Sequence, residues 1–113
     1  MRWLDVIPGR NWLVFGPDAG WIAEAVRASY KPAGVTVVQA PSTNDVYDVA
    51  LSAGGPLDSE LVARMRRALC PSALAAAYQV NEPANLERLF RAAGLHAVQT
   101  CVLQGAAAVK GAR

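Results

Sequence analysis

The residues of this chain that could perform chemistry are few and widely spaced. The sequence holds one histidine, His96, and two cysteines, Cys70 and Cys101, none of them at the close spacing of metal ligands. A lone histidine is more often a satisfied surface or core residue than a general base. We interpret the cysteines as buried apolar thiols and leave a disulfide open. The sequence therefore predicts no metal site and no catalytic residue.

A glycine-containing loop is the clearest candidate for ligand binding. An apolar run over residues 12–15 ends in Gly16, and Gly20 follows four residues later at the start of a helical pattern. Glycines after a strand let the backbone approach a ligand, but Pro17 removes one backbone donor and Asp18 adds a carboxylate. We therefore interpret the two glycines as a tight strand-to-helix turn, with Asp18 as the helix cap.

Other polar candidates follow later strands. Ser52, Gly54 and Gly55 come at the carboxyl end of an expected strand, which is the edge where open α/β sheets bind ligands. Any surviving small-molecule pocket is expected there. Asn81 and Glu82 follow the next strand at the same edge, although helix capping also explains Asn81. Asp48, inside its strand, is interpreted as a hydrogen-bond acceptor.

Strands and helices alternate along the chain, which indicates one α/β domain over residues 1–113 with a mostly parallel sheet. The link between Val38 and Val46 is too short for a covering helix, so these two strands are not expected to be neighbours joined by one. We expect strands over residues 12–15, 35–38, 46–52 and 74–80, helices over 18–30, 57–69 and 81–93, and a C-terminal hairpin over 95–109.

Composition limits the classes of partner. Hydrophobic residues make up 53% of the 113-residue chain, the net charge is +2, and the basic residues are spread along it. This pattern speaks against a nucleic-acid partner. No apolar run reaches the length of a membrane span, and charges and a proline interrupt the N-terminal stretch, so we expect no membrane association and a cytoplasmic protein.

Three local patterns resemble the class I S-adenosylmethionine-dependent methyltransferases. Residues 47–52, Y-D-V-A-L-S, are similar to that fold's F-D-hydrophobic-hydrophobic strand. Residues 67–72, R-A-L-C-P-S, resemble its R-x-L-x-P-G-G helix end, and residues 89–95 resemble its last helix running into the antiparallel strand. The resemblance covers nearly the whole chain and implies a pared-down, Rossmann-like methyltransferase fold rather than an activity.

The cofactor motif of that family is altered in this chain. The resemblance implies D-x-G-x-G-x-G after the first strand, but Val14 stands at the acid and Asp18 at the middle glycine. A carboxylate at Asp18 would repel the carboxylate of the cofactor. The ribose-binding acid expected after the second strand is replaced by Gln39. We therefore expect no cofactor in this domain and no methyl transfer.

Within this fold the chain is similar to the N-terminal domain of the anamorsin family. The short length, the eroded loop and the Y-D-V-A-L-S strand carry the likeness. The resemblance implies a non-catalytic, protein-binding domain of a cytosolic iron–sulfur assembly and electron-transfer factor that docks a diflavin reductase. Its iron–sulfur clusters would belong to a C-terminal segment absent here. A small atypical methyltransferase, or the regulatory subunit of one, is the alternative.

Two surfaces are candidates for a docking face. Trp21 falls off the apolar stripe of its helix, although partial burial against the N-terminal segment is the interpretation we favour. Arg64, Arg66 and Arg67 form a basic run suited to an acidic partner. A charge run on a helix is usually only solvated.

Overall fold

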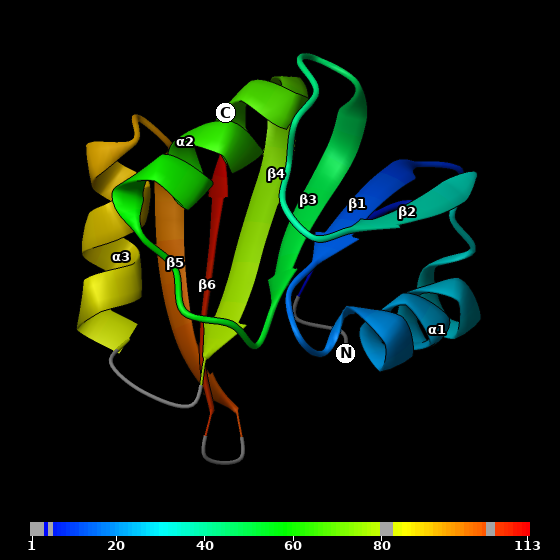
Figure 1. The fold of residues 1–113 in the computed structure, drawn as a ribbon, viewed down its shortest axis with the longest axis horizontal. Coiled ribbons are helices and arrows are strands. Elements are labelled where there is room, and N and C mark those ends of the chain that lie inside the picture. The colour runs from blue at the N-terminus through cyan, green and yellow to red at the C-terminus, as the bar shows by residue number, and fades with distance from the viewer. Residues whose placement is uncertain (1–3, 5, 80–82, 104–105) are drawn as a thin grey trace.

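The computed structural model describes residues 4, 6–79, 83–103 and 106–113. These residues form six strands and three helices, whose arrangement is drawn in Figure 1. In chain order they are β1 (Asn11–Phe15), α1 (Ala19–Tyr30), β2 (Gly34–Val38), β3 (Tyr47–Ala53), α2 (Ser59–Ala68), β4 (Leu69–Gln79), α3 (Pro83–Ala92), β5 (His96–Leu103) and β6 (Ala106–Ala112). No helix of this described part is long and apolar enough to span a membrane.

The strands form one mixed sheet in the order β2-β1-β3-β4-β6-β5. The first four in this order are parallel, and β6 runs antiparallel to both β4 and β5. The predicted α/β class, with a mostly parallel sheet and a C-terminal antiparallel hairpin, is confirmed. Because the carboxyl ends of the parallel strands lie at one end of the sheet, the loops that follow β1 and β3 meet there.

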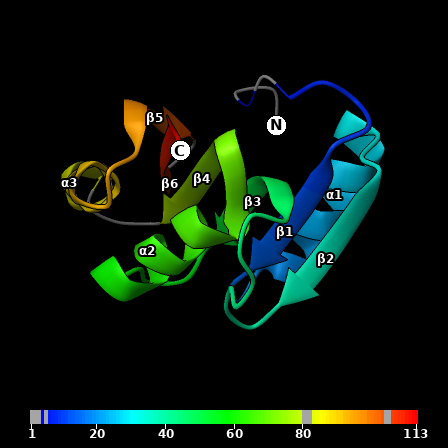
Figure 2. The same ribbon diagram turned by 90° about the horizontal axis from the view of Figure 1, so that it is seen from above.

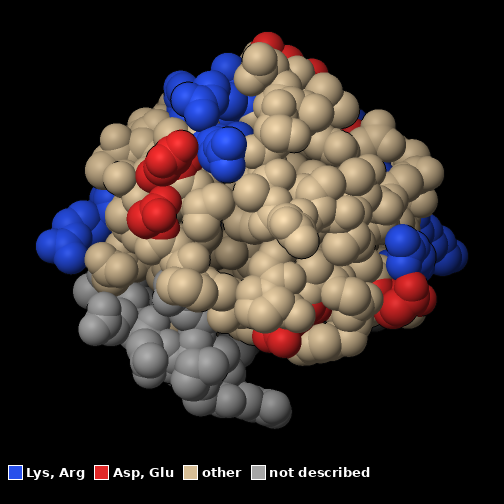
Figure 3. Space-filling view, viewed as in Figure 1, with Lys and Arg blue, Asp and Glu red and all other residues tan. Residues whose placement is uncertain are grey.

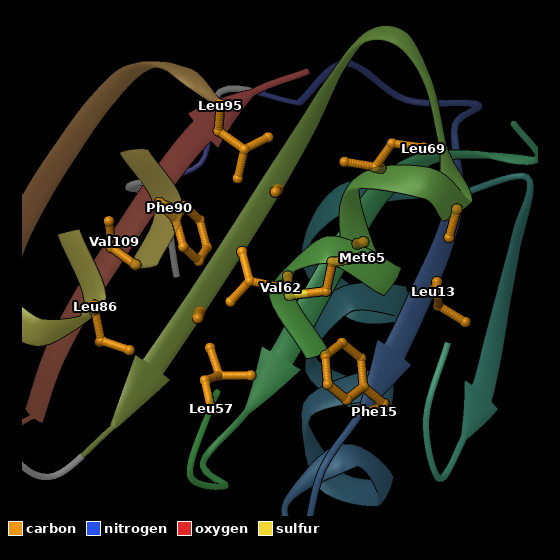
Figure 4. Close-up of a cluster of buried hydrophobic side chains, with 14 of the residues drawn as sticks. Leu13, Phe15, Leu57, Val62, Met65, Leu69, Leu86, Phe90, Leu95 and Val109 are labelled. Atoms are coloured by element: carbon orange, nitrogen blue, oxygen red, sulfur yellow. The ribbon is translucent and has the colours of Figure 1, made fainter. Parts of the chain in front are cut away.

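Helices cover both faces of the sheet: α1 lies on one face, and α2 and α3 lie on the other (Figure 2). The apolar residues of β1 alternate between the two faces of the sheet. Trp12 and Val14 pack with α1, whereas Leu13 and Phe15 pack with α2 and α3. Such burial on both faces explains a continuous apolar strand. In Figure 4, Phe90 of α3 lies in the core of the second layer. Burial of each such side chain stabilises the fold by about 1.5–3 kcal/mol.

The short link between β2 and β3 crosses the sheet without a helix. The two strands lie on either side of β1, so the expectation that no covering helix joins them as neighbours is confirmed. Pro41 in the link is fully buried, and the amides of Asp45 and Val46 donate to the Arg67 and Ala68 carbonyls at the end of α2. This crossing leaves β2 at the edge of the sheet, with β1 as its partner among the described strands.

The strand after α2 begins earlier than predicted. Leu69 already pairs with Tyr47, whereas the next paired residue of β4 is Leu74, opposite Val49. The intervening residues form an irregular turn in which Ser72 has a φ of 67°. Pro71 and this irregular turn interrupt the alternating pattern, so the sequence does not indicate the start of the strand. The interpretations that rest on Asn81, Glu82 and the hairpin turn at 104–105 lie outside the described residues.

Candidate functional site

The glycine loop after β1 is held by a side chain from the end of β4. The Tyr78 hydroxyl donates a hydrogen bond of 2.8 Å to the Asp18 carboxylate, and this bond is partly buried. Asp18 does stand at the N-cap of α1, as predicted, but its side chain does not cap the helix. Sequence reasoning missed Tyr78. The available signal was its place at the end of a strand whose carboxyl edge adjoins the loop.

The loops after β1 and β3 interlock through close backbone contacts. The Asp18 amide donates to the Ala53 carbonyl at 3.0 Å. Gly16 has a φ of 109°, and a Cβ at this position would lie 2.7 Å from the Ala53 oxygen. A Cβ on Gly54, whose φ is 86°, would lie 2.3 Å from the Asp18 carboxylate. Packing between the two loops therefore requires these glycines, independently of any ligand.

The electrostatics of the pair make Tyr78 a donor rather than a base. Burial raises the pKa of Tyr78 well above its ordinary value, and the hydrogen bond to Asp18 and the negative charge of that carboxylate raise the pKa further. The phenol is therefore neutral at physiological pH. It can hold a carboxylate in place, but it offers no ready acceptor for a substrate proton.

A hollow of about 650 Å³ lies on the other side of the loop, between α1 and the end of β2. It is lined by Gly16, Pro17, Ala19, Gly20, Val37, Val38 and Gln39. The Gln39 carboxamide is the polar side chain of this lining, and no carboxylate that could hold a ribose is among these residues. The lining therefore lacks the acidic side chain that the resemblance expects to hold the ribose hydroxyls.

The remaining polar candidates are dispersed and engaged in structural contacts. Ser52 is buried within β3. Asp48 accepts a hydrogen bond of 2.9 Å from the Asn11 amide, as its interpretation as an acceptor requires. The His96 Nε2 atom lies 3.0 Å from the Arg113 carbonyl oxygen, at the far end of the sheet from Asp18. These residues do not form a catalytic group.

The cysteines are less buried than predicted. Both are half-buried, and neither belongs to a disulfide. The Cys70 thiol donates to the Asp45 carbonyl at 3.3 Å, which is possible because the turn after α2 brings Cys70 beside the link that precedes β3. Within the described ranges, no three His, Cys, Asp or Glu residues are grouped so that they could hold a metal ion.

The two predicted surfaces are placed differently. Trp21 is 62% exposed, so the favoured expectation of partial burial is wrong, and the residue is available for contact. Lys and Arg atoms gather at the upper left of Figure 3, over α2. The three arginines of that helix do not act together: Arg66 has a buried Nε and lies against Gly94, whereas Arg64 and Arg67 line a hollow beside the β2–β3 link.

Solved structures of methyltransferases resemble this fold. A chain of the complex between the Haloferax volcanii Trm112 methyltransferase activator and a putative methyltransferase aligns with a TM-score of 0.82 at 12% identity, over 96% of this chain and 84% of that one. A SAM-dependent methyltransferase from Aquifex aeolicus aligns with a TM-score of 0.75 at 13% identity, over 95% and 84%.

A longer protein shares the same fold. The Haemonchus contortus phosphoethanolamine N-methyltransferase 2, solved with S-adenosyl-L-methionine, aligns with a TM-score of 0.71 at 12% identity, over 85% of this chain. The chain spans only 35% of the length of that enzyme. No protein-family model and no curated protein matches the sequence. These similarities show that the chain has the Rossmann-like fold of class I SAM-dependent methyltransferases.

Proposed function

We propose that this chain is a non-catalytic subunit with a methyltransferase fold that acts by binding another protein, as the regulatory partner of a methyltransferase. The observation that carries the proposal is the closed loop after β1. Asp18 is bound through its amide to Ala53 and through its carboxylate to Tyr78, at the position where the resemblance expects a cofactor. Bound S-adenosylmethionine would have to displace these contacts and accept a second carboxylate nearby.

The comparisons support a protein partner more than the docking of a diflavin reductase. One similar chain comes from a complex between a methyltransferase activator and a putative methyltransferase. None of the three similar proteins is described as an iron–sulfur assembly factor. The docking of a reductase stays a prediction that rests on the sequence resemblance alone.

The exposed edge of the sheet is the surface we assign to the partner. Strand β2 carries no charge, proline or bulge, and Val37 in it is 47% exposed. The exposed Trp21 adjoins this edge through its neighbour Gly20, because Gly20 and Val37 line the same hollow. At the opposite edge, β5 has a register shift and a φ of 51° at Ala97, which disfavours pairing with another strand. An open, apolar edge such as β2 favours strand addition by a partner.

Calorimetric titration with S-adenosylmethionine and S-adenosylhomocysteine tests the non-catalytic part of the proposal. We expect no heat of binding at ligand concentrations up to about 1 mM. A dissociation constant of that size corresponds to a binding free energy of about −4 kcal/mol. Micromolar binding together with methyl transfer would overturn the proposal.

Binding to a candidate methyltransferase tests the partner surface. A methyltransferase encoded in the same genome is co-expressed with the chain, and its affinity is measured after purification. Val37→Lys places a charge on the β2 edge and should abolish the complex. The matched control is Ile7→Lys, since Ile7 is 60% exposed and lies away from this edge in the hollow lined by Cys70 and Pro71. Equal losses from both variants would refute the assignment of the surface.

A small methyltransferase with an atypical loop is the second candidate. It is favoured by the hollow beside Gly20, which lies at the carboxyl ends of β1 and β2, and by the absence of a side-chain cap at the start of α1. Asp18→Gly removes the carboxylate and restores the glycine of the family motif. If this candidate is right, the variant binds S-adenosylmethionine more tightly than the parent chain does.

A further inference from the structure

A small polar hollow lies between α2 and the link that joins β2 to β3. Its volume is about 180 Å³, and its lining consists of Pro41, Ser42, Thr43, Asn44, Arg64 and Arg67. Apart from the proline, these side chains offer two guanidinium groups, two hydroxyls and one carboxamide, all of which can donate hydrogen bonds. Such a concentration of donors suits an acceptor-rich ligand.

The fold fixes both walls of this hollow. Pro41 anchors one end of the link in the core, and the backbone bonds from Asp45 to Arg67, at 2.8 Å, and from Val46 to Ala68, at 3.0 Å, anchor the other. Arg64 and Arg67 stand three residues apart, so they project from the same side of α2. The hollow is therefore built by anchored backbone rather than by a free loop.

The guanidinium groups of Arg64 and Arg67 form no contact that stabilises the fold through their charge in the described part of the chain. Neither arginine takes part in an ion pair there. Cations near a helix end often satisfy its last carbonyls, but here backbone amides already donate to the carbonyls of residues 66–68. Arg113 adds contacts to the Arg67 and Leu69 carbonyls.

The nearby acidic groups leave the two arginines available. The Asp45 carboxylate, near the β3 end of the link, is paired with Arg113. Glu60 lies one helical turn before Arg64 and forms no ion pair among the described residues. It lowers the positive potential on this side of α2 without cancelling two charges. A ligand with a double negative charge would therefore be attracted to the hollow.

We propose that this hollow binds a phosphate group, either as inorganic phosphate or as the terminal phosphate of a small monoester. A guanidinium fork matches two phosphate oxygens, and the hydroxyls of Ser42 and Thr43 can donate to the others. A carboxylate has only two oxygens and would leave most of these donors without a partner. The volume holds one such group together with a few waters of about 30 Å³ each. The site is independent of the proposed protein partner.

An NMR titration of the ¹⁵N-labelled chain tests this site. Inorganic phosphate, glycerol 3-phosphate and acetate are added in separate arms, with chloride keeping the ionic strength constant. We expect saturable shifts from both phosphate compounds at the amides of residues 42–44 and at the Nε–Hε groups of Arg64 and Arg67. Tighter binding of glycerol 3-phosphate identifies a monoester, and tighter binding of inorganic phosphate identifies the free ion. Acetate binding as tight as phosphate binding would overturn the assignment.

Variants separate a built site from general electrostatic attraction. Arg64→Gln and Arg67→Gln should each weaken phosphate binding at least tenfold, and Arg64→Lys should weaken it by less, since the charge stays and the fork is lost. Thr43→Val should weaken it several-fold without any change of charge. The control, Arg88→Gln, removes an arginine that contacts Asn85 on α3 and should leave the affinity within twofold of the parent value. A loss in this control equal to that in Arg64→Gln, or shifts that never saturate, would refute the proposal.

Discussion

The hydrogen bond between Tyr78 and Asp18 should stabilise the fold, and a double-mutant cycle can measure its contribution. Tyr78→Phe removes the donor, and Asp18→Ala removes the acceptor. A hydrogen bond to a charged group contributes about 1.5–3 kcal/mol, and partial burial places this one at the low end. We therefore expect each single variant to lower the free energy of unfolding by about 1.5 kcal/mol.

The cycle distinguishes this contact from helix capping. Because the Asp18 side chain makes no cap hydrogen bond, Asp18→Ala should cost almost nothing once Tyr78 is already Phe. A true N-cap would cost about 1 kcal/mol in both backgrounds. Urea unfolding followed by tryptophan fluorescence gives the four free energies. A coupling energy below about 0.3 kcal/mol would refute the assignment of Asp18 to Tyr78.

The same pair predicts the response to alkaline pH. The folded state raises the pKa of Tyr78 above its ordinary value of 10.0. Below pH 10 both states carry a neutral phenol, so the contribution is fully present. As the pH rises further, the unfolded chain ionises first and stability is lost until the pKa of the folded state is passed. The stability difference between parent and Tyr78→Phe should therefore shrink above pH 10, and a constant difference between pH 8 and 11 would contradict this explanation.

Three further substitutions probe the loops and the end of α2, each by urea unfolding. Gly54→Ala should cost about 2–3 kcal/mol, because its Cβ displaces the Asp18 carboxylate and its φ is positive; a cost below about 0.5 kcal/mol would show that the loops relax freely. Arg113→Ala should cost about 1–2 kcal/mol through its lost contacts with the Asp45 carboxylate and with the carbonyls of Arg67 and Leu69. Unchanged stability would show that water replaces these contacts. Ser72→Gly should add about 0.5 kcal/mol, since the φ of 67° disfavours a side chain, and a loss of stability would contradict that origin of strain.

Local patterns in the sequence were sufficient to predict the fold. Short apolar runs located β1, β2 and β3 to within a residue at each end, and helical periodicity did the same for α1. The short link after Val38 even indicated which two strands could not be joined by a covering helix. The start of β4 was missed because Pro71 and the turn at Ser72 interrupt the pattern within a strand that is nonetheless paired at Leu69.

The candidate site was less accessible to sequence reasoning. Asp18 was correctly placed at the start of α1, but the partner of its side chain is sixty residues away, and no local pattern indicates it. The arginines of α2 read as a single run, yet the helical rotation turns Arg66 toward Gly94 and the other two toward the β2–β3 link. Such tertiary pairings require the register of the sheet and the path of the links.

Gly16 and Gly54, in the loops after β1 and β3, affect how a glycine motif is interpreted. A homologue that kept the same backbone contacts would have to keep Gly16 and Gly54, whether or not a nucleotide ever reached the loop. Evolutionary retention of these positions would then mimic a nucleotide-binding fingerprint. An enzymatic role assigned to such homologues from glycine spacing alone would then be unfounded, because the packing of the two loops already explains the glycines.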